Sequence, residues 1–443
     1  MKKNSMIILK RVLISAIILL CASLIGIGLL CGVYLLPVDR MNVHVSKDID
    51  IIVNEGDYPA FGEGVFVRMH PYNINFETFF LNNRGMARDN FTDAIMLGNA
   101  ISNPQEKPLL DRALQVYRGD AVECQPIQSL KVQLENENDS VMTSYPRYWH
   151  GYLVILKPLL LIFTYTQIRY LNAFLQVVLL TMLLYMMGKK LGKEYAMAMG
   201  IATLFMFPFI IPLCMQYSTM VYIVLISSNI LLWKIEYWRC NQRYAYFFLL
   251  EGISTCYFDF LTYPIVSLGI PLILLISDYT QEQRNNVKCV LDSCFMWGIG
   301  YGGIWSLKWI LATWLGSTDV IKDALEQAFY RISGNTDTQA SGVNAIEAIL
   351  ANFSCFTNII FIILILITFI LMACQVKKNG ITVLNLIKKQ WTCLTIAALP
   401  FIWYGVLKNH SFDHSSFTYR AMWVSVFGVW TAILNMCRAK SSD

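Results

Sequence analysis

Two aspartates, Asp89 and Asp93, are the residues whose type and spacing first indicate chemistry. They lie four residues apart in the segment Arg88-Asp89-Asn90-Phe91-Thr92-Asp93, and this spacing places two side chains on one face of a helix. Like charges at that separation raise the pKa of a carboxyl group, and burial near a membrane raises it further. Such a pair can act as a base or bind a cation. The alternative is an exposed turn in which Asp89 or Asn90 caps the following helix.

A short segment near the C-terminus, Asn409-His410-Ser411-Phe412-Asp413-His414, holds two of the five histidines. Together with Asp413, His410 and His414 offer three ligands to a divalent cation. Hydrogen bonding to a substrate or proton transfer is a second use for these side chains. A polar loop at the membrane interface is the third interpretation, so a metal site stays open at this point.

Several cationic side chains are candidates for binding an anionic substrate. Arg147, Arg169 and Arg420 belong to this group, because a guanidinium can bind phosphate through two parallel hydrogen bonds. Arg420 begins an apolar run and can instead extend to lipid headgroups. Lys308 lies inside an apolar run, where a charge is costly and is typically functional or paired. Glu251 is its candidate partner, and extension of the lysine to the surface is the alternative.

The elements that must position these residues follow from the composition of the chain. Of the 443 residues, 56% are hydrophobic and 15% are charged, which is typical of an integral membrane protein with long apolar runs. The net charge of +5 resides in short loops between these runs, where basic residues set the orientation of a membrane protein. We therefore expect no nucleic-acid partner. The twelve cysteines are scattered and serve as small apolar side chains.

The hydropathy pattern predicts an all-α polytopic membrane protein with about ten transmembrane helices and both termini in the cytoplasm. Residues 1–36 form a signal anchor and first helix, residues 37–166 form a large mixed extracytoplasmic loop, and residues 167–443 form the polytopic domain. The predicted spans are Val12–Leu36, Tyr170–Met187, Tyr195–Leu213, Thr219–Trp233, Tyr244–Phe258, Pro264–Ile276, Cys289–Leu315, Phe356–Cys374, Trp391–Leu407 and Ala421–Met436.

Within the large loop, a strand is predicted at Ile49–Val53 and short helices at Asp89–Ala100 and Lys107–Tyr117. The segment Tyr152–Tyr165 is apolar but interrupted by Lys157 and Pro158, and it predicts a helix that lies on or dips into the outer leaflet. In this topology both aspartates of the pair and all histidines lie on the outer side.

This order of elements resembles the GT-C class of membrane glycosyltransferases. The segment Thr166–Leu175 is similar to the start of their second span, and the segment from Trp149-His150-Gly151 to Pro158-Leu159-Leu160 is similar to their juxtamembrane element. The resemblance implies a polyprenyl-phosphate sugar donor, and inverting transfer of the sugar on the outer face of the plasma membrane. It also implies a catalytic acid in the first outer loop. Asp39, Asp89 and Asp93 are the candidates for that acid, and Asp89 is preferred.

The function expected from the resemblance is transfer of a sugar to a cell-surface glycan or lipid acceptor, as in polysaccharide biosynthesis of the cell envelope. Arg147, His150, His410, His414, Arg420 and Lys308 are the expected substrate-binding residues. The expected partners are the lipid-linked donor, the acceptor and membrane lipids, and a divalent cation is the one cofactor considered. The alternative is a flippase, polymerase or transporter of lipid-linked glycans, although no internal repeat typical of transporters is present.

Overall fold

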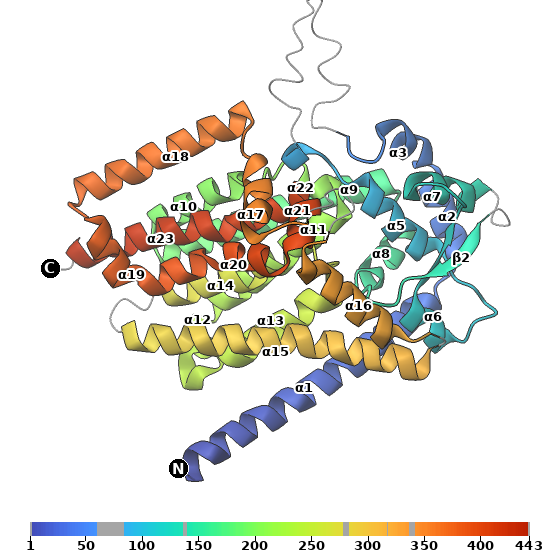
Figure 1. The fold of residues 1–443 in the computed structure, drawn as a ribbon, viewed down its shortest axis with the longest axis horizontal. Helices are drawn as coiled ribbons and strands as arrows, with labels where there is room; N and C mark the ends of the chain where they lie inside the picture. The colour runs from blue at the N-terminus through green and yellow to red at the C-terminus, as the bar shows by residue number, and fades with distance from the viewer. Residues whose placement is uncertain are drawn as a thin grey trace, which may run out of the picture.

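The computed structural model describes residues 2–59, 84–135, 140–277, 283–316, 318–335 and 342–441. These residues form a mostly helical chain (Figure 1). The first part comprises α1 (Lys2–Tyr34), α2 (Val38–Ser46), α3 (Ile49–Glu55), η1 (Arg84–Met86), α5 (Asn90–Ile101), α6 (Leu109–Gln115), β1 (Tyr117–Asp120), α7 (Pro126–Glu135), β2 (Val141–Ser144) and α8 (Leu153–Leu160).

The remainder of the described chain is helical. It comprises α9 (Tyr165–Lys190), α10 (Lys193–Leu204), η3 (Ile211–Leu213), α11 (Met215–Trp233), α12 (Ile235–Arg239), η4 (Cys240–Gln242), α13 (Tyr244–Phe258), α14 (Ile265–Ser277), α15 (Gln283–Leu315), α16 (Val320–Ser333), α17 (Ala345–Ser354), α18 (Ile359–Lys378), α19 (Val383–Ala397), α20 (Leu399–Val406), α21 (Lys408–Asp413), α22 (Ser415–Thr418), η5 (Tyr419–Ala421) and α23 (Met422–Ser441).

Five helical stretches in the described part of the chain are long and apolar enough to cross a membrane. They are Leu9–Tyr34, Tyr165–Lys190, Met215–Trp233, Ile359–Lys378 and Ser415–Arg438. The protein therefore has the architecture of a helical membrane protein. The count of ten spans and the side on which the termini lie stay predictions.

Three predicted elements differ from the observed ones. The predicted strand at Ile49–Val53 is wrong, because this segment forms α3. Ile49 and Ile52 are its buried residues, and this three-residue spacing puts both on the inner face of a helix. The predicted span Trp391–Leu407 is divided at Ala398 between α19 and α20. The predicted span Tyr195–Leu213 is shorter in the structure, because its helix, α10, ends at Leu204.

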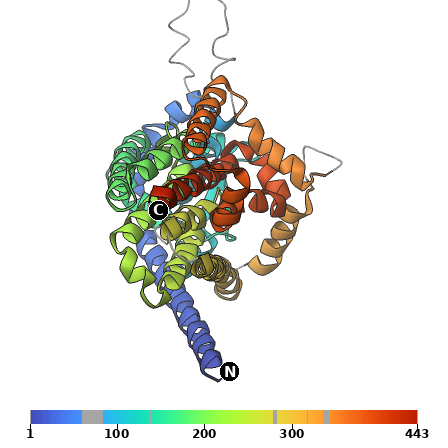
Figure 2. The same cartoon turned by 90° about the vertical axis from the view of Figure 1, so that its left-hand side faces the viewer.

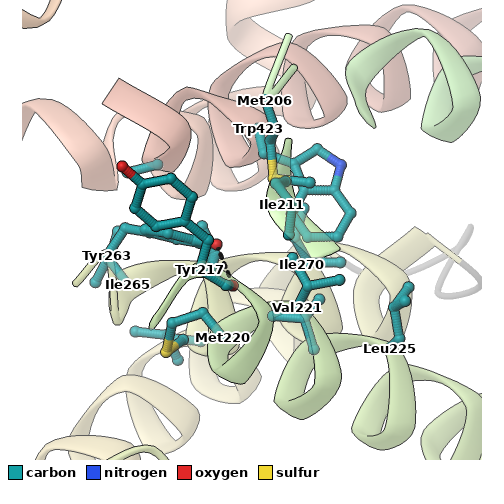
Figure 3. Close-up of a cluster of buried hydrophobic side chains, with 14 of the residues drawn as sticks. Met206, Ile211, Tyr217, Met220, Val221, Leu225, Tyr263, Ile265, Ile270 and Trp423 are labelled. Carbon is teal, nitrogen blue, oxygen red and sulfur yellow. Dashed lines mark hydrogen bonds between the residues drawn. The ribbon is translucent and has the colours of Figure 1, made fainter. Parts of the chain in front are cut away.

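The core of the helical part lies between α11, α14 and α23. Figure 3 shows Val221 and Leu225 of α11 beside Ile270 of α14, with Trp423 of α23 above them. A hydrogen bond of 2.7 Å from the Tyr263 hydroxyl to the Tyr217 carbonyl closes one end of this cluster. Burial of these apolar side chains fixes the N-terminal end of α11, where the site described below is formed.

The α13 and α15 helices pack in unusually close contact. A Cβ atom added to Gly252 of α13 would lie 2.2 Å from the Trp297 carbonyl oxygen, and one added to Gly300 of α15 would lie 2.2 Å from the Leu249 carbonyl oxygen. Small residues allow such close backbone approach between membrane helices. The pair therefore forms a stable support for the loop that follows α13.

The segments α2 to α8 gather at one end of the molecule, and both termini lie at the other end (Figure 1). Figure 2 looks onto the end that carries the termini. The strands β1 and β2 pair antiparallel, with Tyr117 opposite Ser144. Asn99 of α5 donates 2.9 Å to the Tyr152 hydroxyl, and Lys157 of α8 donates 2.6 Å to the Ala100 carbonyl. These bonds hold α5 against α8, the helix that the sequence predicts at the membrane surface.

Candidate functional site

Asp89 is the N-cap residue of α5. Its Oδ1 accepts a hydrogen bond of 2.8 Å from the Thr92 N–H, and its Oδ2 accepts one of 3.0 Å from the Thr92 hydroxyl. The residue is only 3% exposed. Burial, opposed by the Thr92 N–H and assisted by the charge of Asp93, raises the pKa of Asp89 to about 7. Capping and an altered pKa, which the sequence left as alternatives, therefore occur in the same side chain.

Asp93 has a different environment and lies outside the pocket that Asp89 lines. Its Oδ2 accepts hydrogen bonds from the Tyr165 hydroxyl (2.5 Å) and the Met215 N–H (2.9 Å), and its Oδ1 accepts one from the Gln216 N–H (3.2 Å). These two N–H groups have no acceptor within α11 because they lie in its first turn, and a negative charge is favourable at that end of a helix. Asp93 therefore ties α5 to α9 and α11.

A pocket of about 460 Å³ opens beside Asp89, and we call it the Asp89 pocket. Its walls come from the segment before α5, from α16, from α21 and α22, and from the loop between α13 and α14. The rings lining it are Tyr58, Phe91, Tyr145, Tyr148, Tyr217, Phe260 and Phe417. A concave site with aromatic walls and a few converging polar groups has the usual composition of a small-molecule site.

His410 and His414 both line the Asp89 pocket, as their place in one short loop predicts. The Nε2–H of His410 donates to the Leu261 carbonyl (2.7 Å), and its Nδ1 accepts from the Arg331 guanidinium (3.2 Å). These partners fit the neutral imidazole with its proton on Nε2. Burial and the neighbouring His414 and Arg331 also hold the pKa of His410 well below its usual value.

His414 stands beside His410, with the two ring centroids 4.8 Å apart, and its side chain is exposed. His414 is therefore the histidine of this loop that can meet a bound ligand. In the described part of the chain, no three histidine, cysteine or acidic side chains are grouped in a way that could hold a metal ion.

Arginines supply positive charge to the lining of the Asp89 pocket, and Asp89 and Asp413 supply negative charge. Arg84, Arg88 and Arg331 line it. Arg88 is paired with Glu55 at 2.6 Å, whereas no ion pair among the described residues includes Arg84 or Arg331. These two guanidinium groups lie outside any described ion pair, although Arg331 donates to the His410 ring, and neither was selected from the sequence. The signal for Arg331 is its place in the last turn of an amphipathic helix, α16.

Arg420 lies behind the pocket wall, with no exposed surface. Its guanidinium donates to the carbonyls of Ser416 (2.9 Å) and Gly85 (3.1 Å) and stacks 4.1 Å above the Tyr217 ring. The positive charge opposes the rise in the pKa of Asp89. The structure thus places Arg420 where it supports the pocket and acts on Asp89 through the electrostatic field.

Arg147 and His150 lie outside the Asp89 pocket. The Arg147 guanidinium binds Asp323 of α16 at 2.9 and 3.0 Å. The buried His150 makes hydrogen bonds with the Tyr145 carbonyl (2.6 Å) and the Tyr152 hydroxyl (3.2 Å). Both residues shape the segment that carries Tyr145 and Tyr148 into the pocket.

Lys308 and Asp39 are also remote from it. Lys308 donates 2.5 Å to the Leu114 carbonyl, and no ion pair joins it to Glu251 in the described chain. Asp39 is exposed on α2 and lines a separate surface hollow with His44 and Leu161. Of the three candidate acids Asp39, Asp89 and Asp93, Asp89 is therefore the one that lines the pocket with the histidines and arginines.

Comparison with known proteins gives no relative. No protein-family model, no curated protein and no solved structure matches the chain.

Proposed function

We propose that the protein is a membrane glycosyltransferase that moves a sugar from a polyprenyl-phosphate donor to a hydroxyl group of a glycan or lipid acceptor. The observation that carries the proposal is the position of Asp89, a carboxyl group with a pKa of about 7 that lines a pocket with two arginines outside any described ion pair. A general base works best when its pKa lies near the working pH.

In the proposed reaction, the acceptor oxygen forms the new bond to the anomeric carbon on the face opposite the donor phosphate. The Asp89 carboxylate takes the proton of the acceptor hydroxyl. The bond from the anomeric carbon to the phosphate oxygen breaks, and polyprenyl phosphate leaves as an anion. The products are an inverted glycoside and polyprenyl phosphate, with the transferred proton on Asp89.

Arg84 and Arg331 supply the positive charge that the leaving phosphate needs. Negative charge on that phosphate increases as its bond to the sugar breaks, so guanidinium groups aimed at it stabilise the transition state more than the bound donor. Tyr148, Phe260 and the other aromatic rings of the pocket wall provide flat apolar surfaces for a sugar ring.

The test uses the whole protein in lipid nanodiscs with a radiolabelled polyprenyl-phosphate hexose and a panel of soluble and lipid acceptors. Labelled glycoside should form together with equimolar polyprenyl phosphate. Asp89→Asn should lower the rate by about a hundred- to ten-thousandfold. Asparagine caps a helix about as well as aspartate, so α5 should stay intact.

Asp319→Asn is the matched control, because Asp319 caps α16 by accepting from the Lys322 N–H (3.2 Å) and lies outside the Asp89 pocket. Its transfer rate should equal that of the unaltered protein. Full activity of Asp89→Asn would refute the proposed base. Movement of the donor across the membrane without cleavage of the sugar–phosphate bond would instead support the flippase or transporter alternative.

A further inference from the structure

A second cavity of about 620 Å³ lies between α11 and α13, with α8 and α9 at one end, and we call it the Glu251 groove. Its lining residues on α11 extend from Met215 to Ile230, which corresponds to about 22 Å at 1.5 Å per helical residue. The groove is thus long and narrow, and it follows the direction of a candidate membrane span. This shape suits an extended aliphatic chain.

The mouth of the groove faces outward from the helices. Among its lining residues, Ile155, Ile226 and Leu250 are 55%, 45% and 46% exposed. Ile226 lies on α11, a helix long and apolar enough to cross a membrane, and a large exposed apolar side chain on such a helix contacts lipid. A ligand therefore reaches the groove sideways from the bilayer.

Glu251 is the one acidic residue among the groove-lining residues that the structure describes, and no lysine, arginine or histidine accompanies it. It lies midway along α13 and is 6% exposed, and its Oε1 atom has no hydrogen-bond partner. An acidic side chain at such a depth is costly and is typically paired. No described ion pair includes it, so the described residues supply no charge that would balance its carboxylate.

The surroundings of Glu251 match a positively charged group on an apolar body. The hydroxyls of Ser227 and Ser254 line the groove near it, and the rings of Tyr222, Trp238 and Phe247 line the same cavity. Aromatic faces attract cations, and an uncompensated carboxyl selects a positive partner over a neutral one.

We propose that the Glu251 groove binds a long-chain amine from the bilayer, with the amine nitrogen against the Glu251 carboxyl and the aliphatic chain along α11. The neutral amine partitions into the bilayer and enters the groove, where its nitrogen takes the proton of the neutral carboxyl. An ammonium–carboxylate pair forms, and no net charge crosses the apolar region. This site is independent of the Asp89 pocket and of glycosyl transfer.

The experiment uses the whole protein in phosphatidylcholine nanodiscs and two photoreactive probes of equal chain length, one a primary amine and one an alcohol. Labelled peptides are located by mass spectrometry, and half-saturating probe concentrations are compared. The amine should label α11 and α13 residues of the groove and should saturate at a concentration at least about tenfold lower than the alcohol, as expected for a hydrogen bond to a charged group.

Glu251→Gln should remove that preference for the amine, and Glu194→Gln, which removes an exposed acid on α10, should keep it. Ile226→Trp should obstruct the groove and reduce amine labelling, whereas Val178→Trp on the exposed face of α9 should not. If Glu251→Gln does not fold, the two tryptophan variants and the comparison of the two probes still decide whether the groove binds the amine.

Equal labelling by both probes would show a groove for aliphatic chains alone and overturn the proposal. Absence of amine labelling in the unaltered protein would overturn it as well.

Discussion

The Nε2–H of His410 donates a hydrogen bond of 2.7 Å to the carbonyl oxygen of Leu261, which lies 149 residues earlier in the chain. Leu261 has a φ of 67°, a left-handed backbone conformation that is unfavourable for a branched side chain. The bond joins α21 to the loop after α13 and thereby keeps Phe260 in the wall of the Asp89 pocket. His410 is therefore a positioning residue of this pocket.

His410→Ala should lower the free energy of unfolding by about 1–3 kcal/mol, because the Leu261 carbonyl loses a buried hydrogen-bond donor. Thermal unfolding in detergent micelles measures this change. His414→Ala is the matched comparison, since His414 is exposed to the same pocket and should shift stability by less than about 0.5 kcal/mol. Equal decreases in the free energy of unfolding for the two variants would show that the hydrogen bond to Leu261 does not stabilise the protein.

Stability should respond to pH through Asp89. The pKa of its carboxyl is about 7 in the folded protein and 3.8 as the reference value, so the folded state holds a proton that the unfolded state has released between these values. Stability therefore falls as pH rises from about 4 to about 7. Asp89→Asn should remove this part of the dependence and should stabilise the protein more at pH 8 than at pH 5. Denaturant titrations at the two pH values test the sign, and a larger gain at pH 5 would contradict it.

Asp93→Asn should destabilise the protein by about 1–3 kcal/mol, in contrast to Asp89→Asn. An asparagine keeps one acceptor oxygen, and its amide N–H₂ would face the Met215 or Gln216 N–H groups that now donate to Asp93. The measurement is thermal unfolding of both variants at pH 8. Residual transfer by folded Asp93→Asn protein should keep the pH profile of the unaltered protein, because Asp93 holds helices together and does not face the pocket.

Arg331→Gln should weaken donor binding. The guanidinium lines the Asp89 pocket and contacts the neutral His410, so its charge remains for a phosphate, and loss of a charge-assisted hydrogen bond should raise the donor Kd by at least about tenfold. Arg40→Gln is the control, because Arg40 is exposed on α2 and lines the separate surface hollow that includes Asp39. The measurement is the Kd of labelled donor for both variants at fixed ionic strength. Equal Kd values would remove Arg331 from the proposed phosphate site.

The sequence by itself determined the features that depend on neighbouring residues. Runs of apolar residues predicted α9, α11 and α13 close to their observed bounds, because hydropathy and helix period are read within one segment. The capping role of Asp89 was also visible, since a cap and the N–H groups that it binds lie within four residues. Ile49–Val53 was misjudged because a short apolar run fits a strand and a helix equally well.

Only the tertiary structure decided which of these residues act together. The Asp89 pocket joins Arg84, Phe260, Arg331 and His414, which are spread along the chain from residue 84 to residue 414, and no local pattern encodes that packing. The same packing separated Asp89 from Asp93, because the free N–H groups at the start of α11 bind Asp93. The same packing buries Arg420 behind the pocket wall and places Arg331 in the pocket lining. The sequence pointed to Arg420 and not to Arg331, and burial against distant helices decided which of the two lines the pocket.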